Sequence, residues 1–293
     1  MNGDLLQPGW RERGVPVNGL NLHVVDAGRE GDPLLILLHG FPEFWWAWRL
    51  QIAPLVEAGF HVVVPDMRGY NLSDAPEALS AYRLHILADD VAALGAAFGA
   101  DRFDLVGHDW GGVVAWAVAG RHAERLRRLV IMDAPNPDVW GGQALEHPTQ
   151  MLRSAYVGFF QAPWLPEATL AALNFAGMKT MLARSAHAGA FSDDDLERYA
   201  EAWSRPGVLT AMLNYYRALR ERPRPETPVR IRTPTLILWG EKDAFLEHHV
   251  ARAALDLCDD GRLTIVEGAT HWLHLEEPEW VVDLILDHLQ RDG

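Results

Sequence analysis

Apolar residues in this chain gather in short runs that are separated by helical stretches. Runs of strand length occur at residues 33–38, 61–65, 103–106, 126–132, 235–239 and 262–266. Runs so uniformly apolar are typical of parallel strands covered on both faces. Residues 47–58 and 84–98 carry apolar residues at helical spacing, and an Asn18-Gly19 turn near the start predicts a hairpin. The alternation predicts an α/β fold with a mostly parallel, doubly wound sheet.

The alternation of strands and helices is interrupted between residues 137 and 230. This stretch contains amphipathic helical pieces and no convincing strand. We expect it to form a mainly helical cap over the carboxyl edge of the sheet, where open α/β sheets bind ligands. The chain is then divided into a core of residues 1–136 and 231–293 and a cap of residues 137–230.

The composition of the chain argues against several classes of protein. With 26 Lys and Arg against 40 Asp and Glu, the formal net charge of −14 argues against a nucleic-acid partner. One cysteine, Cys258, leaves no internal disulfide. No apolar run approaches the roughly 20 residues of a membrane helix, and residues 1–13 lack the pattern of a secretion signal. We therefore expect a cytoplasmic protein that binds no membrane.

The motif Gly107-His108-Asp109-Trp110-Gly111 directly follows a predicted strand and precedes a predicted helix. Small residues on both sides of a central side chain are typical of the strained turn that presents the nucleophile of α/β-hydrolases. The alternative is that Asp109 caps the helix. A carboxylate nucleophile that attacks a saturated carbon forms an alkyl ester, which water can hydrolyse. Epoxides and carbon–halogen bonds are suitable electrophiles.

Two further segments supply an acid and a base. Asp243 follows the strand at 235–239 and His271 follows the strand at 262–266, which gives the order nucleophile, acid, histidine. We expect His271 to deprotonate water and Asp243 to orient His271. Asp133 is an alternative acid, and His274 an alternative histidine.

The loop His39-Gly40-Phe41-Pro42 ends the strand at 33–38. A loop in this position supplies one N–H group of an oxyanion hole, and the residue after the nucleophile supplies the other. We assign these donors to Phe41 and Trp110. The Phe41–Pro42 bond is a candidate cis peptide.

From about residue 15 to residue 289, the chain resembles the epoxide hydrolase branch of the α/β-hydrolase superfamily. The matching segments are residues 39–43, 66–70 with Ser73-Asp74, 107–112, Asp243 in its loop, and His271-Trp272 before Glu277-Pro278. The resemblance implies an α/β-hydrolase fold, an aspartate nucleophile and an inserted cap.

The resemblance also implies two tyrosines contributed by the cap. Tyr156, within residues 155–163, and Tyr216, within residues 213–217, match the two family segments, although Tyr215 replaces the usual Trp. Opening an epoxide develops an alkoxide, and a phenol with a pKa near 10 can donate a proton to it. The alternative for each is a packed tyrosine with a solvated hydroxyl group. We expect Tyr215 to point away from its neighbour.

The pocket is expected to be mainly apolar and to take a small epoxide-like substrate. Its candidate lining residues are His39, Pro42, Phe160, Trp164 and Trp272. The histidines do not form a spaced set with cysteine or paired carboxylates, so we predict neither a metal nor a cofactor. The oligomeric state is left open, a dimer included.

Three other functions are alternatives to epoxide hydrolysis. A haloalkane or haloacid dehalogenase would use the same nucleophile, but Phe41 has no side-chain donor for a halide and no Arg follows Trp110 to bind a substrate carboxylate. A non-catalytic ligand receptor would need none of the three catalytic groups, and an esterase would carry Ser in place of Asp109. We therefore predict epoxide hydrolysis.

Overall fold

The computed structural model describes residues 5–221 and 227–291. Its centre is an eight-stranded sheet in the order β1-β2-β4-β3-β5-β6-β7-β8. The strands are β1 (Trp10–Val17), β2 (Leu20–Ala27), β3 (Leu34–Leu38), β4 (His61–Pro65), β5 (Phe103–His108), β6 (Leu126–Met132), β7 (Thr235–Gly240) and β8 (Gly261–Val266). β2 pairs antiparallel with β1 and β4, and all other pairs are parallel. The predicted mostly parallel sheet is confirmed.

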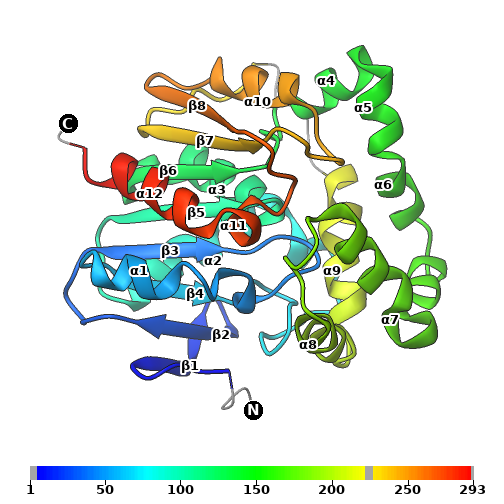
Figure 1. The fold of residues 1–293 in the computed structure, drawn as a ribbon, viewed down its shortest axis with the longest axis horizontal. Coiled ribbons are helices and arrows are strands. Elements are labelled where there is room, and N and C mark those ends of the chain that lie inside the picture. The colour runs from blue at the N-terminus through cyan, green and yellow to red at the C-terminus, as the bar shows by residue number, and fades with distance from the viewer. Residues whose placement is uncertain (1–4, 222–226, 292–293) are drawn as a thin grey trace.

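Helices cover both faces of the sheet, which is why its inner strands are mostly apolar. α1 (Ile52–Glu57) and α12 (Pro278–Leu289) lie in front of the sheet in Figure 1, and α2 (Leu84–Ala97) and α3 (Trp110–Arg121) lie behind it. Every residue of β3, β4, β5 and β7 is buried. The other helical elements of this part are η1 (Trp45–Trp48), η2 (Leu79–Tyr82), η3 (Ala123–Arg125), α10 (His248–Leu255) and α11 (Leu273–Glu276).

The single helix predicted at residues 47–58 is wrong. The segment forms the 3₁₀ turn η1 and then the short helix α1. Pro54 has no N–H group, so it is tolerated in the first turn of α1 but would break the interior of a longer helix. The 3₁₀ turn buries Trp45 and Trp48 together. Packing of these two indoles and the position of the proline explain the division.

The described part of residues 137–230 is helical and contains no named strand. Its elements are α4 (Trp140–Glu146), α5 (Pro148–Arg153), α6 (Ala155–Phe160), α7 (Leu165–Ser185), α8 (Asp193–Trp203), α9 (Val208–Arg217) and η4 (Ala218–Glu221). They lie together beyond the carboxyl ends of the parallel strands (Figure 1). The cap boundaries at residues 137 and 230 stay a prediction.

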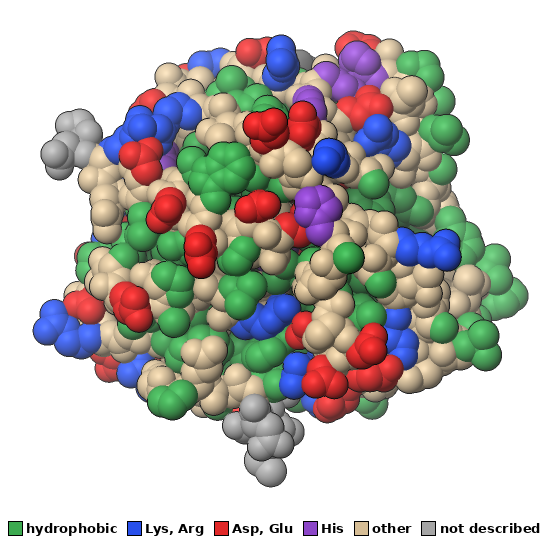
Figure 2. Space-filling model, in the orientation of Figure 1, with side chains coloured by type: hydrophobic (Ala, Val, Ile, Leu, Met, Phe, Trp, Pro, Cys, Tyr) green, Lys and Arg blue, Asp and Glu red, His purple; other side chains and the backbone are tan. Residues whose placement is uncertain are grey.

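The face drawn in Figure 2 mixes acidic and basic side chains, without a basic field among the described residues visible there. Apolar side chains gather over the cap helices at one edge of this view. Exposed large apolar residues of the cap include Leu145, Met151, Leu152, Trp164 and Leu173. Within the described ranges, no helix is both long and apolar enough to cross a membrane.

The turn from β5 into α3 requires small residues because backbones meet there. A β-carbon on Gly111 would lie 2.6 Å from the carbonyl oxygen of His39 and closer still to that of Leu38. These backbone atoms belong to the end of β3 and its following loop, so they cannot rotate away as a side chain could. The glycine therefore allows α3 to start against the end of β3.

We predict that Gly111→Ala destabilises the protein by about 2 kcal/mol or more, the upper range for added volume in a packed interior. The free energy of unfolding is measured by urea denaturation. Gly142→Ala in α4 is the matched control, since a β-carbon there meets nothing within 4 Å. Its stability should be unchanged or raised by up to about 1 kcal/mol. Equal stabilities of the two variants would contradict the close approach.

Candidate active site

Asp109 occupies the turn between β5 and α3. Its φ of 48° is in the left-handed region, which costs energy for a residue other than glycine and often accompanies function. Its side chain makes no capping hydrogen bond to α3, so the capping alternative is wrong. Oδ1 instead accepts a hydrogen bond of 2.7 Å from the Phe41 amide. Oδ2 lies 3.6 Å from His271 Nε2.

His271 links Asp109 to Asp243. Its Nδ1 lies 2.8 Å from Asp243 Oδ2, and Asp243 Oδ1 accepts hydrogen bonds from the amides of Phe245 and Leu246. Burial opposes charge on His271, but Asp243 and then Asp109 outweigh burial and raise its pKa well above the usual value. Burial likewise opposes charge on Asp243, but His271 and the two amides lower its pKa. The pair is thus a carboxylate facing an imidazolium.

The alternative histidine, His274, lies away from the nucleophile. Its Nε2 lies 3.2 Å from Glu43 Oε1, and burial together with His108 lowers its pKa to about 4. His108 Nδ1 also contacts Glu43, at 2.9 Å, and His108 Nε2 lies 2.8 Å from the carbonyl oxygen of His271. This buried group therefore supports the loop that carries His271.

Sequence reasoning did not assign this supporting role to Glu43 and His108. Both residues directly adjoin the catalytic motifs, one after Pro42 and the other before Asp109. Their position next to these motifs is the sequence feature that could have indicated the supporting role.

Two buried clusters bring nitrogen and oxygen atoms within 4.8 Å of one another: Glu43 with His108 and His274, and His108 with Asp133 and His271. Hydrogen bonds within the clusters and to the backbone account for both arrangements. We assign no metal ligand to either.

The two cap tyrosines reach the same pocket from α6 and α9. The ring centroids of Tyr156 and Tyr216 are 5.9 Å apart, and the two rings meet edge to face. Burial, with a further contribution from the charge on Asp109, raises the pKa of both phenols. Both are therefore protonated at neutral pH.

Tyr215 points elsewhere, as predicted. Its hydroxyl group donates a 2.8 Å hydrogen bond to the carbonyl oxygen of Arg68. Successive residues of a helix differ in direction by about 100°, so Tyr215 packs on the core while Tyr216 faces the pocket.

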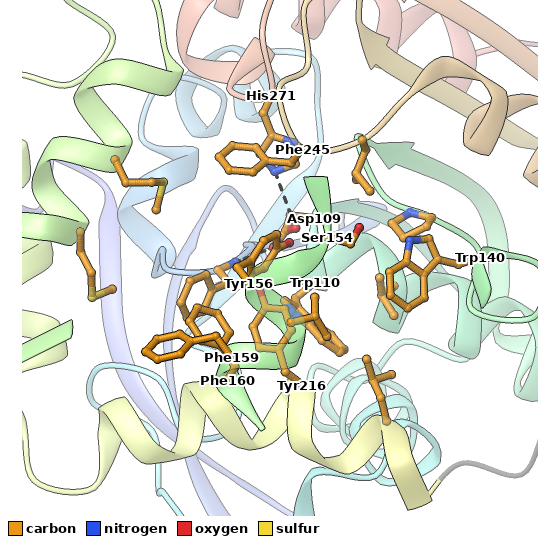
Figure 3. Close-up of a pocket in the computed structure, with 18 of the residues that line it drawn as sticks. Asp109, Trp110, Trp140, Ser154, Tyr156, Phe159, Phe160, Tyr216, Phe245 and His271 are labelled. Carbon is orange, nitrogen blue, oxygen red and sulfur yellow. Dashed lines mark hydrogen bonds and ion pairs between the residues drawn. The ribbon is translucent and has the colours of Figure 1, made fainter. Parts of the chain in front are cut away.

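A cavity of about 380 Å³ lies between the cap and the sheet edge. Figure 3 shows Asp109 and His271 facing one another, with Tyr156 close to the nucleophile and Tyr216 beside Trp110. Most of the lining is apolar, and its other members include Val113, Pro135, Pro137, Trp140, Ser154, Val157, Phe159, Leu170, Gly177, Met178, Met181, Leu219, Phe245 and Leu246.

Of the predicted lining residues, Phe160 and Trp272 line the cavity, but His39, Pro42 and Trp164 do not. His39 is fully buried, and its ring nitrogens contact the Gly40 carbonyl oxygen and the Met67 amide. Pro42 is buried, and its carbonyl oxygen accepts a hydrogen bond from the Trp203 indole. Trp164 precedes α7 and is 73% exposed.

The predicted oxyanion donors both adjoin Asp109. The Phe41 amide already contacts Asp109, and the Phe41–Pro42 bond is cis, as expected. α3 begins at Trp110, so the Trp110 amide is one of those that the helix leaves without an intrahelical acceptor.

Residues 33–278 match the family model described as alpha/beta hydrolase fold. The AB hydrolase superfamily protein YfhM of Bacillus subtilis is 44% identical over 94% of this chain and 96% of its own length. Human epoxide hydrolase 4 is 38% identical over 94% of this chain and 77% of its own length. An epoxide hydrolase from Bacillus megaterium, solved with an inhibitor, has a TM-score of 0.86 and 28% identity, and the match covers 95% of this chain and 100% of that one.

The fold, the geometry around Asp109 and these similarities agree, and the chain belongs to the epoxide hydrolase branch of the α/β-hydrolase superfamily.

Proposed function

We propose that this enzyme opens epoxides to vicinal diols through a covalent ester on Asp109. The observation that carries the proposal is the opposition of a carboxylate and two protonated phenols across one apolar cavity. One oxygen of Asp109 is held by the Phe41 amide, which leaves the other free to attack. Relatives named as epoxide hydrolases support the same reaction.

In the first step, Asp109 Oδ2 forms a bond to an epoxide carbon while the carbon–oxygen bond of the ring breaks. The departing oxygen takes a proton from Tyr156 or Tyr216, so that no free alkoxide has to form. The cap supplies both phenols, whereas the core supplies the nucleophile. Closure of the cap on the core thus brings the acid and the nucleophile to opposite sides of the substrate.

Ester formation prepares the second step. It removes the negative charge of Asp109, which is one of the groups that raise the pKa of His271. His271 then releases its proton more easily, and through solvent this proton restores the tyrosine that was deprotonated in the first step. The neutral His271 takes a proton from water. The hydroxide attacks the ester carbon, and the negative charge develops on Oδ1, where the Phe41 amide already lies and the Trp110 amide is close by. The bond between the carbonyl carbon and Oδ2 then breaks, and the leaving oxygen takes the proton of the hydroxyl group that was added to Asp109. The diol leaves, and the Asp109 carboxylate and the His271 imidazolium are restored.

The cavity favours small apolar epoxides. Asp109 and His271 are the charged or titratable members of its lining besides the two tyrosines, and no Lys or Arg is found among the described lining residues. A substrate carboxylate would lack a counterion here, which argues against haloacids. Phe41 offers no side-chain donor to a halide, and the Trp110 ring packs edge to face against the Tyr216 ring, with their centroids 5.0 Å apart.

We predict that the protein converts styrene oxide to its diol and that Asp109→Ala lowers turnover about 10⁴-fold or more, since no nucleophile remains. Diol is measured by chromatography. The same assay with a 1-haloalkane and with fluoroacetate should release little halide. Rapid halide release without diol would favour a dehalogenase, and inactivity on all three would favour a ligand receptor.

We predict that His271→Gln allows ester formation but slows ester hydrolysis about 100-fold or more, because the general base is lost. Intact-mass spectrometry should then detect protein heavier by one substrate molecule. His85→Gln, an exposed histidine on α2, serves as the control and should accumulate no adduct. Epoxide consumption by His271→Gln at the wild-type rate would contradict the role of this base.

We predict that the double variant Tyr156→Phe/Tyr216→Phe slows ester formation about 100-fold or more, the range expected for loss of a general acid. Ester formation is followed in single turnovers with enzyme in excess. Tyr215→Phe is the matched control, because it removes a neighbouring hydroxyl group that faces the core. An unchanged rate in the double variant would mean that the cap supplies no acid.

A further inference from the structure

A second buried carboxyl group, Asp133, lies beside the Asp243–His271 pair and takes no part in the steps above. It directly follows β6 with a φ of 42°, and it is fully buried. Its Oδ1 accepts a 2.8 Å hydrogen bond from the Gly240 amide. Its Oδ2 is buried and has no hydrogen-bond partner among the described residues. This carboxyl group is therefore only half satisfied.

Titratable groups from three other segments face Asp133. Asp243, from the loop after β7, is near enough for its charge to act on Asp133. His271, after β8, and His108, at the end of β5, each bring a ring nitrogen within 4.8 Å of a carboxyl oxygen of Asp133. The two acids that the sequence offered as alternatives thus lie in one site, next to the same imidazole.

The hydrogen bonds around the two acids are unequal. Asp243 accepts bonds from His271, Phe245 and Leu246, whereas Asp133 accepts one from Gly240. Ionising two adjacent carboxyl groups in a buried site costs much free energy, because their negative charges repel each other. The carboxyl group that accepts more hydrogen bonds therefore keeps the charge. Burial, followed by the charge on Asp243, raises the pKa of Asp133 well above its usual range.

We propose that Asp133 is a positioning residue that stays a neutral carboxylic acid, donates a hydrogen bond to Asp243, and becomes the anionic partner of His271 when Asp243 carries no charge. Its unpartnered Oδ2 then carries the proton. The catalytic part of this inference rests on the proposed function.

A neutral acid beside Asp243 has a chemical consequence. The donated hydrogen bond is a fourth one to the Asp243 carboxylate and lowers its basicity. Asp243 is then less able to remove the proton that His271 takes from water. The imidazolium survives until the diol leaves, while Asp243 still orients the ring.

The kinetic test compares Asp133→Asn, Asp243→Asn and the double variant by the single-turnover rate of ester hydrolysis. Loss of the acid from a triad lowers turnover about 10⁴-fold. Asp133→Asn alone should change the rate by less than about threefold, because its amide still donates to Asp243 and accepts from Gly240. Asp243→Asn should lose about 100-fold or less, and the double variant should lose about a further 100-fold.

The pH profile separates this role from a structural one. In Asp243→Asn, the rate of ester hydrolysis should rise with pH as Asp133 releases its proton to solvent, and this rise should be absent from the double variant.

A second measurement, by infrared spectroscopy, needs no substrate. The wild type should have an infrared band of a buried carboxylic acid at neutral pH, and this band should be lost in Asp133→Asn and also in Asp243→Asn, where Asp133 ionises.

Two results would overturn the inference. One is an equal effect of Asp133→Asn on the wild type and on Asp243→Asn, since Asp133 would then act independently of Asp243. The other is the absence of the carboxylic-acid band from the wild type. Failure of the proposed function is distinct from both, because the wild type would then form no ester with an epoxide while the infrared result would stand.

Discussion

The structure of this site depends on the hydrogen bond from the Phe41 amide to Asp109 Oδ1. It joins the loop after β3 to the turn after β5, and it makes the two oxygens of one carboxylate unequal. One oxygen is held by the backbone, and the other faces His271 and the cavity. The close approach that this bond needs is possible because Gly40 and Gly111 leave no side chain between the two backbones.

Several titratable groups surround this carboxylate. Asp243 and then Asp109 favour the protonated form of His271, and burial, with a further contribution from the charge on Asp109, raises the pKa of the two cap phenols. A change of charge on Asp109 therefore affects the pKa of His271 and of both tyrosines. An apolar lining strengthens this coupling, since little water is present to screen it.

Most of the fold could be predicted because the signals are local. The apolar runs matched the strands to within one or two residues, and glycines around Asp109 indicated the strained turn. The helix predicted at 47–58 failed because a proline and the burial of two tryptophans outweighed helical spacing. His39 and Pro42 were misjudged for a related reason. They belong to the loop that carries the Phe41 amide, but their side chains are buried away from the cavity.

The sequence by itself determined where the inner strands lie and that an acidic residue occupies the turn after β5, and it offered candidates for the acid, the histidine and the two cap tyrosines. These depend on spacing and residue type, which are properties of the chain. Only the tertiary structure decided that His271 rather than His274 meets Asp109, that Asp133 and Asp243 share one site, and which cap residues line the cavity. Such contacts join residues far apart in the chain, so their distances depend on how the cap and strands pack.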